Sequence, residues 1–240
     1  MIIAVKNHSR VPDGEVLAAI RAVNRQISED FEPYWDLSGT LRLADRSIKA
    51  LQADGIIRIW DGGHNAHIET DGIPTAHIFT EVSKLAKETM PWLTWHSGLS
   101  HEALEMLADP YMNTLVRGPH PVSLRQVFHY REVCDPVQAQ TYEIDGITVS
   151  DFVLPHYYNS DGETNGRNDF LGTGLKAFRW NDDGEIGFFD PKLGKDGRYV
   201  SWPEYDSDDP VSKLRKLQAK TGRLYRYAHP AKLTPARLRS

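Results

Sequence analysis

The sequence has little cysteine and no long apolar run, which excludes an internal disulfide and a membrane-spanning helix. Its 240 residues include a single cysteine, Cys134, so the chain cannot form an internal disulfide, which fits a reducing compartment. No stretch approaches the roughly 18 consecutive apolar residues of a membrane-spanning helix, and the apolar run at the N-terminus is too short for a signal peptide. We therefore expect a cytoplasmic protein that has no membrane partner.

Basic and acidic residues are distributed unevenly along the chain. The formal net charge is −5, yet residues 213–240 contain nine Lys and Arg and no acidic residue. The preceding 212 residues therefore hold 19 basic and 33 acidic side chains, a net charge of −14. We expect a final basic helix over 211–227 that packs against the acidic body or is solvated. Binding of nucleic acid or another polyanion by this basic tail is the alternative.

The spacing of apolar residues predicts an α+β fold. The composition, 40% hydrophobic and 25% charged, is that of an ordinary globular protein. Apolar residues recur at helical spacing over 14–31, which predicts an amphipathic helix that Pro33 should end. Strands are expected at 2–5, 41–43, 56–60, 67–70 and 75–80, a hairpin at 142–149, and a small β-element within 176–203.

A stretch near the middle of the chain has acidic residues but no basic ones. Read as a helix, it aligns His101, Glu105 and Asp109 at i, i+4 and i+8, with Glu102 beside them and Pro110 where the helix should stop. Exposed helix faces usually mix charges, because like charges at i, i+4 cost roughly 0.2–0.5 kcal/mol per pair. A divalent ion held by His101 and Glu105 would remove this repulsion, and a solvated acidic face is the alternative.

The same stretch is a variant of the zinc-binding motif H-E-x-x-H. In that motif two ligands one helical turn apart hold zinc, and the glutamate after the first ligand acts as general base. Here His101 is the first ligand, Glu105 replaces the second histidine, and Glu102 is the candidate base. Because so short a pattern is common by chance, the hypothesis needs support from a longer span of sequence.

Longer blocks of the chain resemble a family of uncharacterised bacterial and phage proteins with a zincin-like metalloprotease fold. The blocks are SHEALEMLADP at 100–110, EVCDP at 132–136, VSDFVLP at 149–155 and NDFLG at 168–172. The resemblance implies a zincin-like domain over 1–175, with a small mixed sheet, an N-terminal helix and a metal-site helix. Residues 176–240 would be a C-terminal extension of strands and a helix that carries the basic tail. The resemblance also implies that 77–82 is an edge strand that binds extended peptide, and its phage members make a virion-associated location the alternative to the cytoplasm.

A catalytic zinc usually has three protein ligands and one water, so a third ligand must come from outside the helix. Glu132, in the acidic block after the helix, is our prediction. Asp135 in the same block is the competing choice, and Asp109 is either an alternative ligand or a residue that orients one. Cys134 is a soft donor that zinc accepts, although a lone cysteine is more often a small buried apolar residue.

Together these residues predict a metal-dependent hydrolase of the metallopeptidase type, with a peptide or protein as substrate. We expect zinc to polarise the scissile carbonyl while Glu102 takes a proton from the attacking water. One histidine and two carboxylates also suit manganese, iron or calcium, so the metal is left open. The alternative is a catalytically silent zincin-like protein, structural or interacting and related to phage proteins, whose acidic cluster holds a structural ion or none.

Overall fold

The structure is a computed structural model that describes residues 1–44, 52–62, 66–67, 72–81, 91–159, 166–193 and 198–202. The helices are α1 (Asp13–Arg25), the π-helix η1 (Gln26–Phe31), α2 (Glu32–Trp35), α4 (Trp95–Ala108), and the short 3-10 helices η3 (Asp135–Val137) and η4 (Pro155–Tyr158). The strands are β1 (Ile2–Asn7), β2 (Thr40–Leu43), β3 (Gly55–Gly62), β4 (Ala66–His67), β5 (Thr75–Glu81), β6 (Leu115–Pro119), β7 (Gln126–Tyr130), β8 (Thr141–Ile144), β9 (Ile147–Ser150), β10 (Ile186–Asp190) and β11 (Arg198–Trp202). The helix predicted at 211–227 and the basic tail lie outside the described residues.

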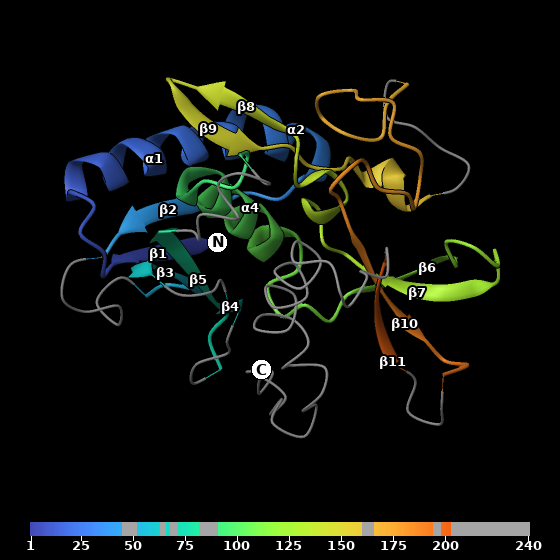
Figure 1. The fold of residues 1–240 in the computed structure, drawn as a ribbon. Helices are drawn as coiled ribbons and strands as arrows, with labels where there is room; N and C mark the ends of the chain where they lie inside the picture. The colour runs from blue at the N-terminus through green and yellow to red at the C-terminus, as the bar shows by residue number, and fades with distance from the viewer. Residues whose placement is uncertain are drawn as a thin grey trace.

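A five-stranded mixed sheet forms the base of the N-terminal part. Its strand order is β2-β1-β3-β5-β4, and only β4 runs antiparallel to its neighbour. Helices α1 and α4 lie on one face of this sheet, and the β8–β9 hairpin packs on the other side of the two helices (Figure 1). The apolar stripe of each helix is therefore enclosed between sheet and hairpin, which fixes how α4 is rotated about its axis.

The predicted α+β class is confirmed. Helix accounts for 27% and strand for 32% of the structure, and the larger sheet is mostly parallel. Within the described ranges, none of the helices combines the length and the apolar character that crossing a bilayer would require.

The prediction that 77–82 forms the edge of the sheet is wrong at His77, and within the described residues 78–81 pair only with β3. Strand β4 lies outside β5, with Ala66 opposite His77 and His67 opposite Ala76. Strand β5 therefore has β3 on one side along its length and β4 on the other side at two residues only.

The predicted N-terminal helix is confirmed, but its end is not where proline was expected to place it. Helical structure continues from α1 through the π-helix η1 into α2 and stops only after Trp35. Pro33 lies directly after the π-helix, where the helical hydrogen-bond pattern changes, and the helical run continues two residues beyond it.

Helix α4 ends close to the predicted stop at Pro110, and it begins at Trp95. Thr94 and Ser97 form a capping box at its start, each side-chain oxygen accepting a hydrogen bond of 3.0 Å from the other residue's backbone N–H. The helix ends at Ala108, two residues before Pro110. The apolar arc is buried as expected, but Glu105 and Asp109 are also only 3% exposed. The acidic line of α4 therefore faces the protein interior rather than solvent.

A second sheet, not fully predicted, lies beyond the C-terminal end of α4. Its order is β11-β10-β7-β6, all antiparallel, and the sequence analysis gave no strands for β6 and β7. Phe188 of β10 lies opposite His129 of β7. The predicted domain boundary at residue 175 therefore falls between strands of one sheet.

Candidate metal centre

The acidic line of α4 meets the loop at 132–135, and the two segments bring their polar side chains together. His101 Nε2 lies 3.2 Å from Glu105 Oε1 and 3.3 Å from Asp135 Oδ1. His101 and Glu105 share a face because they are one helical turn apart, whereas Asp135 comes from the first position of η3. An imidazole and two carboxylates thus converge from two separate elements.

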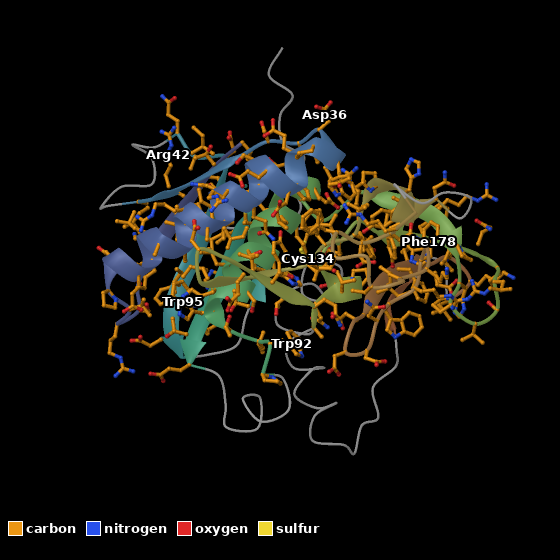
Figure 2. The ribbon with its side chains drawn as sticks, turned by 90° about the horizontal axis from the view of Figure 1, so that it is seen from above. Asp36, Arg42, Trp92, Trp95, Cys134 and Phe178 are labelled. Atoms are coloured by element: carbon orange, nitrogen blue, oxygen red, sulfur yellow. The ribbon has the colours of Figure 1, made fainter. Side chains whose placement is uncertain are left out.

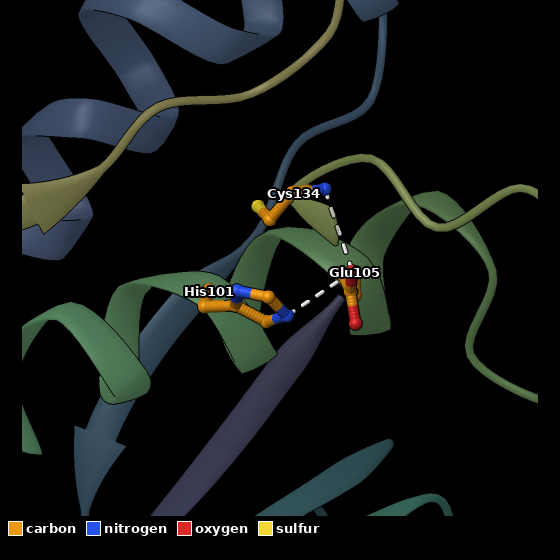
Figure 3. Close-up of side chains that lie close together, drawn as sticks. All are labelled: His101, Glu105 and Cys134. Carbon is orange, nitrogen blue, oxygen red and sulfur yellow. Dashed lines mark hydrogen bonds and ion pairs between the residues drawn. The ribbon is translucent and has the colours of Figure 1, made fainter. Parts of the chain in front are cut away.

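Two overlapping groups of donor atoms in the described residues have the spacing of a metal site. His101, Glu105 and Cys134 form one group, and Glu105, Glu132 and Asp135 form the other. Within each group the donor atoms lie within 4.8 Å of one another, and Glu105 belongs to both. Figure 3 shows His101 and Glu105 on α4 with Cys134 on the facing loop.

These donor residues are buried. Glu105 and Glu132 are each 3% exposed and Asp135 is 2% exposed. The His101 side chain is 15% exposed. Burying carboxylates away from water costs several kcal/mol per ion unless an opposite charge or hydrogen bonds compensate. A donor set of one imidazole, three carboxylates and one thiol fits a divalent transition metal, which would supply such compensation.

The loop at 132–135 is held by backbone hydrogen bonds to three other segments. The Tyr158 hydroxyl donates to the Glu132 carbonyl oxygen at 3.0 Å, and Val153 N–H donates to Val133 O at 2.7 Å. On the other side, Glu185 N–H donates to Asp135 O at 3.0 Å. The C-terminal segment therefore takes part in positioning the acidic loop, which the sequence analysis did not foresee.

A buried polar network fixes α4 next to His101. The Ser100 hydroxyl donates to Gln26 Oε1 at 2.7 Å and accepts from Ser150 N–H at 3.0 Å, while Gln26 Nε2 donates to Ser150 O at 2.8 Å. Gln26 is the first residue of the π-helix, a geometry that often marks functional positions. Sequence reasoning missed Gln26, although a glutamine next to Ile27 within an apolar helix pattern was a usable signal.

Asp109 and Glu132, both predicted as possible metal ligands, differ in their position relative to the two donor groups. Asp109 belongs to neither donor group in the described residues, and its Oδ2 accepts a hydrogen bond from Thr114 N–H at 2.8 Å. Burial raises the pKa of Asp109, against the lowering effect of hydrogen bonds from Thr114 and Asn113. Asp109 therefore organises the turn after α4. Glu132, the predicted third ligand, does lie in the cluster, but Asp135 is the carboxylate placed next to His101.

Cys134 is fully buried beside these charges. Burial, and then the negative charge of Glu105, raises the pKa of the Cys134 thiol well above its ordinary value, while a hydrogen bond with Ser150 opposes the shift. The charge of Glu102 also contributes to the higher pKa of Cys134. Glu102, the candidate general base, belongs to neither donor group in the described residues.

A small cavity adjoins the acidic loop on the side of the second sheet. Its volume is about 10 Å³, room for roughly one water molecule. Glu132, Asp135, Tyr130, Tyr158 and Glu185 are among the residues that line it. The cavity therefore provides polar space next to two of the carboxylates.

Comparisons with known proteins identify no relative. No protein-family model matches the chain, and neither a curated protein nor a solved structure matches it. The zincin-like resemblance stays a prediction, and the case for a function depends on the geometry of the site.

Proposed function

We propose that this protein is a metal-dependent hydrolase of zincin type, with His101, Glu105 and Asp135 as metal ligands and Glu132 as the alternative third ligand, which leaves one coordination position open. The observation that carries the proposal is the placement of His101 Nε2 at 3.2 Å from Glu105 Oε1 and 3.3 Å from Asp135 Oδ1. Donor atoms on one tetrahedral zinc ion lie roughly 3.3–3.8 Å apart, given bonds of about 2.0–2.3 Å. An ion would therefore need little rearrangement of these three side chains.

The proposed chemistry divides between the ion and the protein. A bound divalent ion would act as a Lewis acid on a substrate carbonyl. Glu102 follows the first ligand and acts as general base, taking the proton of the attacking water and passing it to the leaving group. The Tyr158 hydroxyl and the Ser100 network hold the acidic loop and α4 in the geometry that this requires. A peptide substrate is proposed from the zincin-like resemblance.

The test combines metal analysis with hydrolysis of a peptide library. Glu102→Gln should bind metal as the unaltered protein does but lose hydrolysis, because the amide cannot accept the proton. Glu105→Gln should lose both. Glu15→Gln, a change of the same kind at an exposed position of α1, is the matched control and should keep both properties. Equal hydrolysis by the unaltered protein and by Glu102→Gln would refute the assigned base.

Burial of the cluster favours a second candidate, a silent protein with a structural ion. Catalytic zinc sites keep an open coordination position, whereas structural sites are closed. Here the three carboxylates are at most 3% exposed and the adjoining cavity holds roughly one water. This candidate predicts tight metal binding and a higher unfolding temperature with metal, with no hydrolysis of any peptide in the library.

A further inference from the structure

We infer that the sulfur of Cys134 is a ligand of the same ion, so that the site selects a thiophilic metal such as zinc over manganese or calcium. This inference rests on the proposed metal site but not on hydrolysis. It turns an oxygen-rich set of ligands into a mixed nitrogen, oxygen and sulfur set, and it assigns a role to the chain's single cysteine.

The geometry places the sulfur among the other donors. Cys134 Sγ, a His101 ring nitrogen and a Glu105 carboxylate oxygen lie within 4.8 Å of one another. Cys134 N–H also points at Glu105 Oε1, at 3.4 Å, so the cysteine backbone is directed towards the helix that carries both other donors (Figure 3). Because a zinc–thiolate bond is about 2.3 Å long, binding of the ion would draw the sulfur closer to the other two donors.

The surroundings of Cys134 differ from those of a cysteine that only fills apolar space. The residue is 0% exposed and near the middle of the molecule (Figure 2), yet its backbone N–H donates to the Glu105 carboxylate at 3.4 Å and its sulfur lies among ring nitrogen and carboxylate donors. The charges of Glu105, Asp151 and Glu102 also act on it. A cysteine that only fills space would be expected in an apolar pocket. The carboxylates around Cys134 would instead attract a cation, and the sulfur could bind it.

A thiolate ligand would change the preference of the site among metals. Thiolates favour zinc, cobalt and other borderline or soft ions, whereas carboxylates and water suit magnesium, calcium and manganese. When the ion binds, the thiol gives up its proton to solvent and the sulfur forms the bond to the metal. One thiolate and three carboxylates would then carry four negative charges close to the ion.

The experiment replaces the metal by cobalt(II) and records the absorption spectrum of the full chain. Thiolate-to-cobalt charge transfer gives a strong near-ultraviolet band, and because the chain has one cysteine the band can come only from Cys134. We expect the band in the unaltered protein. Cys134→Ser should lose it while keeping the weaker visible bands of bound cobalt, and Glu105→Gln should lose both sets.

Visible cobalt bands without the charge-transfer band in the unaltered protein would overturn this inference and leave the proposed metal site standing. Absence of all cobalt bands would overturn the site and the inference together. A competition titration gives a second readout: Cys134→Ser should lower the zinc-to-manganese affinity ratio by more than roughly tenfold, since loss of residues that merely orient ligands already costs about 10–100-fold. An unchanged ratio would contradict the inference, and circular dichroism would verify that the variant is folded.

Discussion

Among the buried acidic side chains of the described residues, two groups differ in what makes their burial tolerable. Glu105, Glu132 and Asp135 lie around an imidazole at the spacing of metal ligands. Asp151 and Asp169, each 0% exposed, form a pair of carboxyls. Burial, and then the charge of Asp169 and a hydrogen bond with it, raise the pKa of Asp151 to about 8 against the lowering effect of the Phe152 N–H.

The two groups differ in how the negative charge of buried carboxyls would be compensated, by a shared proton or by a metal ion. Two facing carboxyls can share one proton, and at neutral pH the raised pKa keeps that proton on the Asp151–Asp169 pair. One shared proton cannot neutralise three carboxylates. Together with the histidine and the cysteine, they form a set of ligands that suits a divalent ion. The proposed metal site follows from this contrast, and the predictions below are ordered from the largest expected effect to the smallest.

Glu105→Gln should weaken binding of zinc by roughly a hundredfold or more, because Glu105 is the one residue shared by both donor groups. The binding constant would be measured by competition with a chelator of known affinity. Asp169→Asn serves as the control, since it changes a carboxyl that is equally buried but belongs to the other group. Equal zinc affinities for these two variants would contradict the claim that only the group around Glu105 binds metal.

Asp151→Asn should remove a pH dependence of stability. The folded-state pKa of Asp151 is about 8 against an ordinary 3.8, so the folded protein holds an extra proton between these values. Its contribution to the free energy of unfolding is complete below about pH 4, falls as the pH rises towards 8 and is constant above that.

Denaturant unfolding of metal-free protein at pH 5 to 8.5 would measure this effect. Relative to Asp151→Asn, the unaltered protein should lose about 1.4 kcal/mol of stability per pH unit between pH 5 and pH 7, because one extra proton bound in the folded state gives that slope. Parallel stability curves for the two proteins would show that Asp151 is ionised in the folded state and that no proton is shared.

Ser100→Ala should destabilise the protein by about 1–3 kcal/mol, because it leaves Ser150 N–H and Gln26 Oε1 without a buried partner. The free energy of unfolding in urea would be the measurement. Ser28→Ala is the matched control: its hydroxyl only donates back to the helix backbone at an exposed position, and the change should be small. Similar losses for both serines would argue that the network adds nothing to stability.

Arg10→Ala should change stability by at most about 1 kcal/mol, although Arg10 forms ion pairs with Asp61 and Glu81. The Arg10 side chain is 77% exposed, so water replaces the lost partner. Thermal unfolding at low and at high salt would measure the effect, which should shrink further at high salt. A loss as large as that of Ser100→Ala would mean that surface charges here matter as much as buried ones.

Local signals in the sequence predicted much of the fold. Four predicted features appear in the structure: the apolar stripe of α4, its end before Pro110, the first strand and the hairpin at 142–149. Each depends on residues that are close together in the chain. Asp145 and Gly146 adopt the positive φ angles that a two-residue hairpin turn needs. Pro33 misled the prediction because its effect depends on its position within the helix, which spacing alone does not give.

The site could be predicted only in part. Periodicity places His101 and Glu105 on one face, but whether that face is solvated or buried depends on the loop at 132–135 and on the second sheet. The contact of His101 with Asp135 depends on how the chain enters η3, where Glu185, 50 residues further on, donates a hydrogen bond to Asp135 O. Contacts between segments 30 or more residues apart leave no periodic signal in the sequence.

An anomalous difference map of crystals grown with zinc, collected on both sides of the zinc edge, tests the central claim most directly. The account predicts a peak within bonding distance, about 2.0–2.3 Å, of His101 Nε2 and of carboxylate oxygens of Glu105 and Asp135. No peak at this position in crystals soaked in excess zinc, with the carboxylates still buried, would contradict it.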